Sequence, residues 1–209
     1  MTSPLILVAD DHPLFRDAVA VGMAAHLPDC RFETAATLAE ALTLLQERTP
    51  ALLLLDLDMP GAEGLSGLVD VRAAAPAVSV AILSATIVPA VVANAIALGA
   101  RGYLHKSLDI TEMIRAIRGL LAGALWLPPQ LDGVPLASHS TATKLAMLSP
   151  QQLRILRMVT SGLLNKQIAA ELGIGEQTVK DHITMILRKM GVTTRTQAAV
   201  EAERAFFAR

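Results

Sequence analysis

Five polar side chains could act together on a charged ligand, because each comes at or just after the end of an apolar run typical of a buried strand. They are Asp10, Asp11, Asp56, Ser84 and Lys106. Open parallel sheets bind their ligands at the carboxyl ends of the strands. These side chains are therefore expected to converge on one mouth.

Three carboxylates at one mouth would repel one another unless a cation joined them. Such a site is expected to bind a hard cation that prefers oxygen ligands, such as Mg²⁺. The metal and Lys106 would supply positive charge, and Ser84 would supply a hydroxyl donor. The pocket is therefore suited to stabilise a phosphoryl group that is transferred to a carboxylate.

The segments that must position these residues alternate between short apolar runs and longer amphipathic stretches, as in a parallel sheet flanked by helices. The predicted strands are Leu5 to Ala9, Arg31 to Ala35, Leu52 to Leu55, Val78 to Leu83 and Gly102 to Leu104. The predicted helices between and after them are Pro13 to His26, Leu38 to Glu47, Gly64 to Ala75, Pro89 to Leu98 and Ile110 to Leu121. Thr37 and Asp109 are predicted N-caps.

The charge of the chain is divided unevenly along its 209 residues. Residues 1–143 contain 8 basic and 14 acidic side chains, whereas residues 144–209 contain 10 basic and 5 acidic ones. A Pro-, Gly- and Ser/Thr-rich stretch between them is expected to be a linker, flexible over Ser138 to Thr143. The overall charge of -1 is thus the sum of an acidic N-terminal half and a basic C-terminal tail. This asymmetry is expected of a regulatory module joined to a module that binds a polyanion.

Composition argues against several classes of protein. The hydrophobic content of 53% is too high for disorder over most of the chain. Cys30 is the only cysteine, so no internal disulfide can form, and a reducing cytosol is the expected compartment. The uncharged run from Ala73 to Ala100 is better explained by a buried strand and a helix than by a membrane span, because proline and polar residues interrupt it. Leu5 to Ala9 lacks a basic flank, so no signal peptide is expected.

Four motifs carry a resemblance over roughly residues 1–122. They are Asp10-Asp11, Asp56-Leu-Asp-Met-Pro-Gly, Ser84-Ala and Gly102-Tyr-Leu-His-Lys106. In order and spacing they resemble the receiver domain of two-component response regulators. The resemblance implies a flavodoxin-like, doubly wound five-stranded parallel sheet over residues 1–122.

The same resemblance implies a role for each residue of the mouth. Asp56 would accept a phosphoryl group from a sensor histidine kinase. Asp11, Asp56 and the backbone carbonyl of Asp58 would bind Mg²⁺, with Asp10 assisting through water. Ser84 and Tyr103 would form a switch in which the hydroxyl follows the phosphoryl group and the ring moves inward. Lys106 would pair with the phosphoryl oxygens.

Two features depart from the receiver pattern. His105-Lys106-Ser107 lacks the proline or acidic residue that often follows this lysine, which leaves the loop conformation open. The helix Pro89 to Leu98 has no charged residue, and a helix that is apolar on all sides is normally covered. We expect this helix to dock on a second receiver in a homodimer, on the kinase or on the C-terminal domain.

In the basic tail, helical patterns are predicted at Pro150 to Ser161, Lys166 to Leu172, Gln177 to Met190 and Arg195 to Arg204. Ala169, Gly173 and Val179 have the spacing of a helix-turn-helix, with a small residue at the crossing, a glycine in the turn and an apolar residue between the helices. With Leu148-Ser-Pro-Gln-Gln, Gly162-Leu-Leu-Asn-Lys-Gln-Ile-Ala, Thr178-Val-Lys-Asp-His and Arg195-Thr-Gln-Ala, the tail resembles the LuxR-type DNA-binding domain. The whole chain is thus similar to NarL/FixJ-family response regulators, with a receiver (1–122), a linker (123–145) and a smaller all-α helix-turn-helix domain (146–209).

Helical spacing divides the side chains of the recognition helix between core and DNA. Val179, Ile183, Ile186 and Met190 are expected to face the core. Lys180, Asp181 and Thr184 are expected to enter a major groove, with Lys180 on guanine acceptors and Asp181 on cytosine N4. Phosphate contacts are expected from Lys166, Thr178, Arg188 and Lys189, and His182 is either a phosphate donor or a packing residue.

Three positions differ from the pattern of many relatives. Leu164 and Gln167 replace Ser and Glu, so the capping box before the scaffold helix is expected to be missing, with Asn165 serving instead. Gln152 replaces Glu, which removes a possible partner for Arg195.

The favoured function is a transcription regulator that is controlled by phosphorylation, with promoter DNA and a histidine kinase as partners and without enzymatic turnover of a substrate. In one alternative, the front half responds to a partner or metabolite independently of phosphorylation. In another, Asp56-Leu-Asp58 is the acidic pair of a haloacid-dehalogenase-type phosphatase, which fits poorly because Asp10-Asp11 precedes the nucleophile.

Overall fold

The computed structural model describes residues 3–131 and 140–206. Its main sheet has five parallel strands in the order β2-β1-β3-β6-β7. These strands are β1 (Leu5–Ala9), β2 (Arg31–Ala35), β3 (Leu52–Asp56), β6 (Ser79–Ser84) and β7 (Gly102–His105). The doubly wound five-stranded sheet expected from the sequence is confirmed.

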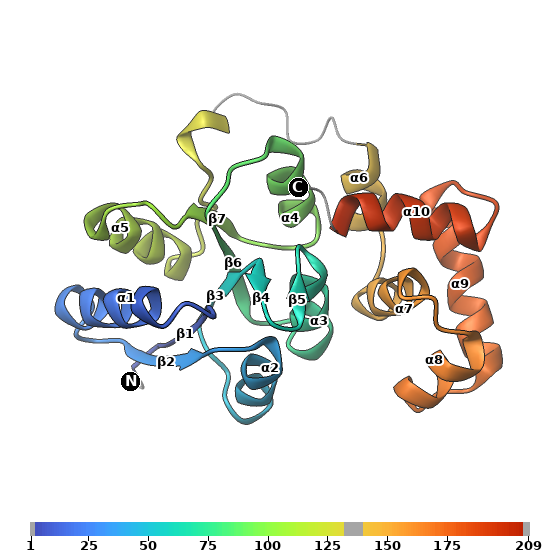
Figure 1. Cartoon of the computed structure of the whole chain (residues 1–209), viewed down its shortest axis with the longest axis horizontal. Coiled ribbons are helices and arrows are strands. Elements are labelled where there is room, and N and C mark those ends of the chain that lie inside the picture. The colour runs from blue at the N-terminus through green and yellow to red at the C-terminus, as the bar shows by residue number, and fades with distance from the viewer. Residues whose placement is uncertain (1–2, 132–139, 207–209) are drawn as a thin grey trace.

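Five helices cover the two faces of this sheet (Figure 1). They are α1 (Pro13–His26), α2 (Leu38–Glu47), α3 (Ser66–Ala74), α4 (Pro89–Ala97) and α5 (Ile110–Leu121). As predicted, Thr37 accepts a hydrogen bond from the Glu40 amide and caps α2, while Asp109 does the same for α5 through Glu112. The uncharged run from Ala73 to Ala100 contains β6 and α4, and no helix within the described residues is long and apolar enough to cross a bilayer.

Successive residues of the central strands point to opposite faces, so each strand contributes to two cores. Leu54 and its alternate neighbours pack with α1 and α5. Leu53 and Leu55 belong to the cluster on the other face, with residues of α2, α3 and α4. That second cluster continues into the C-terminal helices, so the two halves of the chain share one buried apolar region.

The C-terminal half is entirely helical over its described residues. It contains α6 (Ser140–Ala146), α7 (Pro150–Thr160), α8 (Asn165–Leu172), α9 (Glu176–Met190) and α10 (Arg195–Phe206). Gly173 ends α8 with a φ of 64°, in the left-handed region that glycine adopts without strain. This is the turn that the Ala169, Gly173 and Val179 spacing predicts.

Three short elements were not predicted. β4 (Asp58–Met59) and β5 (Ala62–Glu63) form a small antiparallel hairpin after β3, and Pro129–Leu131 form the 3-10 helix η1. Trp126 pairs with the edge strand β7, because its backbone exchanges hydrogen bonds with Arg101 and Tyr103. The first residues of the expected linker are therefore attached to the sheet.

The Ser/Thr-rich end of the expected linker is partly a helix rather than a flexible segment. Residues 132–139 of that linker lie outside the described residues, but α6 begins at Ser140. Leu145 is fully buried and Lys144 forms an ion pair with Glu201 of α10, at 3.0 Å. Tertiary packing thus overrides the low helix propensity of the Ser/Thr composition.

Candidate functional site

Asp10 and Asp56 lie side by side at the carboxyl edge of the sheet. β1 and β3 are neighbours, with Ala9 opposite Leu55, so the next residue of each strand falls at the same edge. The side chain of Asp10 is 0% exposed and that of Asp56 is 1% exposed. Two carboxylates are thereby brought together out of contact with bulk water.

Lys106 neutralises part of this charge from across the sheet. It follows β7, and its backbone amide donates to the Ser84 carbonyl at 2.8 Å. Its ammonium nitrogen lies 2.8 Å from Asp10 Oδ2 and 2.8 Å from Asp56 Oδ2, so one cation bridges both carboxylates. The same nitrogen lies 5.3 Å from the centroid of the Phe15 ring, within the range of a cation–π contact.

Burial raises the pKa of the Asp56 carboxyl group, and hydrogen bonding to Lys106 only partly opposes this shift. Burial also disfavours the charged form of Lys106, but its hydrogen bonds to Asp10 and Asp56 outweigh the loss of water and raise its pKa. The pair therefore consists of a carboxyl group that is costly to ionise and an ammonium group that is hard to deprotonate.

The neighbouring residues complete an acidic cluster. Asp11 contributes a partly buried carboxylate, whose Oδ1 lies 2.7 Å from His12 Nδ1. The ligand atoms that Asp10, Asp11, His12 and Asp56 can offer all lie within 4.8 Å of one another. Three of these four donors are carboxylates, which Mg²⁺ prefers, and one lysine cannot balance them all. The residues present thus fit a hard divalent cation.

His12 was missed by sequence reasoning, which looked for oxygen donors. Its backbone amide donates to Asp10 Oδ1 at 2.8 Å, and its ring nitrogen Nδ1 lies 3.2 Å from the same oxygen. The side chain is 63% exposed, so it lies on the solvent side of the cluster. Its position directly after Asp11 was the available signal.

Ser84 and Tyr103 lie on adjacent strands, as the predicted pair requires, and a third residue joins them. The Thr86 amide donates to Ser84 Oγ at 3.2 Å, and the Tyr103 hydroxyl donates to the Thr86 carbonyl at 3.0 Å. Tyr103 is 1% exposed, and burial raises its pKa. The ring is thus already buried in this structure, and its movement stays a prediction. Thr86 was not predicted as a member of this group.

The loop that carries Lys106 is held by His105 in the absence of proline. His105 Nε2 lies 2.7 Å from the Ala85 carbonyl, and Nδ1 lies 2.5 Å from Ser107 Oγ. Asp58 begins β4, and its amide donates to Asp56 Oδ1 at 3.3 Å. This places the backbone of Asp58, but not its exposed side chain, against the acidic cluster.

The second candidate site is the exposed face of α9. Val179, Ile186 and Met190 are buried, and Ile183 is partly buried, as helical spacing predicts. Most of the predicted DNA-contacting side chains are exposed: Lys166, Thr178, Lys180, Asp181, Thr184 and Arg188. His182 is half-buried, which does not decide between its two predicted roles, a phosphate donor and a packing residue.

Neighbours on α9 pair with the two residues expected to read bases. Lys180 lies 3.1 Å from Glu176, and Gln177 donates to Asp181 at 3.0 Å. Both pairs are four residues apart, the spacing at which helical side chains meet. Glu176 and Gln177 were not among the predicted site residues.

Lys189 does not face the expected DNA side. Its ammonium group donates to the Met147 carbonyl and to Gln152 Oε1, each at 2.8 Å. Gln152 is buried, and its Oε1 also accepts from the Ser149 amide at 3.1 Å, so the lysine that turns towards α7 is a second, charged donor to this oxygen. The assignment of Lys189 to phosphate contacts does not agree with this position.

The expected capping role of Asn165 was also wrong. Asn165 is the first residue of α8, and its side chain accepts a hydrogen bond from Arg195 at 2.8 Å. The Gln167 side chain accepts from the Leu164 amide at 2.7 Å, so half of a capping box survives without a Ser. Asn165 thus replaces the partner that Arg195 lacks at Gln152.

The apolar helix α4 is covered by the C-terminal domain. Asn94 is buried, and its side chain donates to the Ala205 carbonyl of α10 at 3.2 Å. The Leu65 amide donates to the Phe206 carbonyl at 2.8 Å. Three partners were expected for this helix: a second receiver, the kinase or the C-terminal domain. In this structure the partner is the C-terminal domain.

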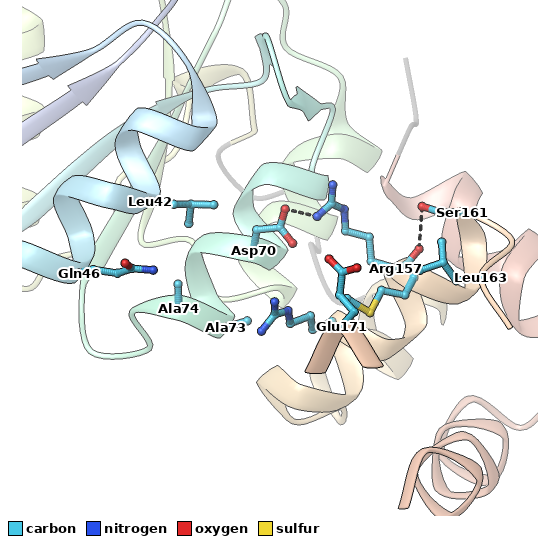
Figure 2. A pocket seen from close by; sticks show the side chains of 11 residues that line it. Leu42, Gln46, Asp70, Ala73, Ala74, Arg157, Ser161, Leu163 and Glu171 are labelled. Carbon is cyan, nitrogen blue, oxygen red and sulfur yellow. Dashed lines mark hydrogen bonds and ion pairs between the residues drawn. The ribbon is translucent and has the colours of Figure 1, made fainter. Parts of the chain in front are cut away.

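A further contact between the domains joins α3 to α7. Figure 2 shows Asp70 and Arg157 pointing toward each other beside a cavity of about 600 Å³, where they form an ion pair. Burial raises the pKa of Asp70, and Arg157 opposes that shift. The cavity is lined by α2 and α3 on one side and by α7 and α8 on the other.

Comparisons with known proteins cover both halves of the chain. The family described as "Response regulator receiver domain" matches residues 6–118, and "Bacterial regulatory proteins, luxR family" matches residues 146–202. A "Glycerol metabolism activator" of Pseudomonas putida is 40% identical over 94% of both chains. The "Nitrate/nitrite response regulator protein NarL" of Escherichia coli K12 is 35% identical over 93% of both chains. The solved structure of the Salmonella typhimurium RcsB response regulator shares the fold, with a TM-score of 0.59 and 20% identity over 96% of this chain and 98% of that one.

Proposed function

The chain belongs to the response regulators that join a receiver domain to a LuxR-type DNA-binding domain, and from this premise we propose that Asp56 is the residue that accepts the phosphoryl group. As a member of this family, the protein is a transcription regulator that is controlled by phosphorylation. The donor that we propose is a sensor histidine kinase, and the proposed target is promoter DNA bound by α9. We place the receiver at 1–122, the linker at 123–145 and the DNA-binding domain at 146–209.

The observation that carries this proposal is the single ammonium group shared by Asp10 and Asp56, at 2.8 Å from each. An oxygen of Asp56 attacks the phosphorus atom, and the donor group leaves with its bonding electrons. In the proposed step, Lys106 pairs with a phosphoryl oxygen, and Ser84 donates a hydrogen bond to the phosphoryl group from the neighbouring strand β6. When bound, Mg²⁺ would neutralise charge on the phosphoryl oxygens. Asp10, Asp11, Asp56 and the Asp58 carbonyl would hold it.

The phosphatase alternative has no observation in its favour. The acidic pair Asp10-Asp11 precedes Asp56 in the chain, and the relatives that match along nearly the whole chain are regulators. Homodimerisation of the phosphorylated or DNA-bound form through α4 also belongs to this proposal. It requires α6 and α10 to leave α4, because they cover it in this structure.

A DNA-binding selection tests both halves of the proposed function at once. Random duplexes are selected with the wild type and Asp56→Asn, each with and without acetyl phosphate and Mg²⁺. We expect both proteins to enrich one sequence motif, and only the wild type to change its enrichment with the phosphoryl donor. Failure of both proteins to enrich any motif at low salt would contradict the role of α9. Equal responses of both proteins to the donor would contradict the role of Asp56.

Magnesium is expected to raise the unfolding temperature of the wild type, because a ligand that binds only the folded state stabilises it. At about 100 times its dissociation constant, the ion would contribute about 2.7 kcal/mol. Asp11→Asn should lose most of this gain, whereas Asp29→Asn, a change at an exposed remote position, should keep it. A full Mg²⁺ shift in Asp11→Asn, measured by differential scanning fluorimetry, would argue against the cation site.

The magnesium effect should weaken as the pH falls. The raised pKa of Asp56 means that the folded protein binds this proton more tightly than the unfolded chain does. Without metal, this group therefore contributes stability at low pH that is lost as the pH rises through its folded-state pKa. Protons and Mg²⁺ compete for the same carboxylate, so the Mg²⁺-dependent shift should be larger at neutral pH than in acid. A shift that is constant with pH would place the ion elsewhere.

A further inference from the structure

The receiver packs against one side of the C-terminal domain, and α9 lies on the opposite side. The receiver's contacts are with α6, α7 and the end of α10, through residues of α3 and α4. The packing partners of α9 are α7, α8 and α10 of its own domain and α6 at the end of the linker. In Figure 1, α9 lies at the right-hand edge of the molecule, with α7 between it and the receiver sheet.

The side chains expected to meet DNA are available in this closed arrangement. Thr178, Lys180, Asp181, Thr184 and Arg188 are all exposed. Over the described residues, the ion pair of Lys180 is with Glu176 and the side-chain hydrogen bond of Asp181 is with Gln177, both on α9 itself. Lys180 keeps 52% of its side-chain surface exposed. Among the described residues, the side-chain hydrogen bonds and ion pairs of these groups are all with α9 itself, so none of them ties α9 to the receiver.

We propose that the closed, unphosphorylated chain binds duplex DNA through α9. The contact between the two domains then buries other surfaces. These are α4, with Val91 and Asn94, and the end of α10 that covers it. This inference rests on the proposed role of α9 as the recognition helix. It implies that phosphorylation changes how chains assemble on DNA more than how tightly one domain holds one half-site.

The acidic charge of the receiver does not remove this affinity at physiological salt. Residues 1–143 carry a net charge of -6, which repels phosphate. The α7 layer between the receiver and α9 is about 10 Å thick, and the Debye length at 0.15 M salt is about 8 Å. Most of the repulsion is therefore screened there, and it should reappear only at low ionic strength.

A chain that is locked shut tests the proposal directly. Asp70→Cys and Arg157→Cys are introduced together with Cys30→Ser, and a short bis-maleimide joins the two new thiols across the domain interface. The matched control is the same protein with both thiols capped by N-ethylmaleimide, which has the same sequence but is free to open. Both forms are titrated with a short duplex that carries one half-site from the selection above, at 0.15 M salt.

The crosslinked and capped forms are expected to bind the single half-site with affinities within about threefold of each other. Binding that is tenfold weaker in the crosslinked form would overturn the proposal, because opening would then be needed to expose α9. If neither these forms nor the wild type bind any duplex at any salt concentration up to 0.15 M, the proposed role of α9 itself is wrong. The two failures are therefore distinguishable.

A phosphoryl mimic provides a second readout on the wild type, without cysteine substitutions. Beryllofluoride with Mg²⁺ should change the affinity for one half-site less than threefold, but should increase the apparent affinity for a duplex with two half-sites more than tenfold. A tenfold gain on the single half-site would contradict the proposal.

Discussion

Asp56→Asn is expected to abolish phosphorylation by acetyl phosphate completely, while Asp58→Asn is expected to retain it. The carboxylate oxygen of Asp56 is the proposed nucleophile, and acetate leaves as the O–P bond forms. An asparagine amide at position 56 lacks this nucleophile, although it keeps nearly the same shape. Asp58 is a matched control, because its side chain is exposed and only its backbone lies against the acidic cluster.

Intact-mass spectrometry after incubation with acetyl phosphate and Mg²⁺ measures this difference as the gain of one phosphoryl group. A labelled Asp56→Asn protein would mean that another side chain accepts the phosphoryl group. An unlabelled wild type with a folded receiver would instead favour the alternative in which the front half responds to a partner or metabolite. The two outcomes contradict different parts of the proposed function.

The acidic cluster could be predicted because it follows from strand order alone. Asp10 and Asp56 come at the ends of apolar runs, and adjacent parallel strands end at one edge. Lys106 also follows a strand end, and its long side chain reaches past β6 to both carboxylates. His12 and Thr86 act through contacts that the chain makes after folding, namely a ring folded back on Asp11 and a carbonyl that meets Tyr103. The place of His12 directly after Asp11 was a signal for its proximity, but no spacing rule predicts that its ring turns back to the carboxylate or that the Thr86 carbonyl meets Tyr103.

Two predictions in the C-terminal half, for Lys189 and Asn165, disagree with the structure because each side chain pairs with a residue of another helix. Helical spacing assigns buried and exposed faces of α9, and Val179, Ile186 and Met190 agree with it. Spacing cannot show that Lys189 turns to a buried amide on α7, or that Asn165 takes the guanidinium of Arg195. Gln152 is buried, and Asn165 and Arg195 are partly buried, so the need to pair these polar groups is visible only when the helices are packed.

The cover on α4 was predicted, with the C-terminal domain as one of three possible partners, and the structure contains that one. A helix without charge must be shielded, and Asn94 is the polar residue that its covering surface has to satisfy. Ala205 provides the acceptor, and Phe206 next to it is fully buried. The sequence leaves the choice open because a second receiver could offer a carbonyl equally well. The partner of α4 becomes clear only in the folded chain, where α6 and α10 pack on this helix.

The largest effect expected on DNA binding is that of Lys180→Ala. If Lys180 reads guanine in the major groove, its loss should weaken binding to the selected site by about 1–3 kcal/mol, or roughly 5- to 150-fold. Its partner Glu176 does not prevent this role, because an exposed i,i+4 ion pair contributes only about 0.3–0.5 kcal/mol and is exchanged easily for a base. The affinity for random DNA should fall much less than the affinity for the selected site.

Lys144→Ala is the matched control, because it removes the same charge from α6, where Lys144 pairs with Glu201. Fluorescence anisotropy at several salt concentrations separates the possible roles of Lys180. Loss of a base-reading lysine lowers specificity and leaves the salt dependence nearly unchanged, whereas loss of a phosphate contact weakens binding to all sequences alike and reduces the salt slope by about one. Equal losses for Lys180→Ala and Lys144→Ala would mean that α9 attracts DNA only by its charge, and that the sequence is read elsewhere.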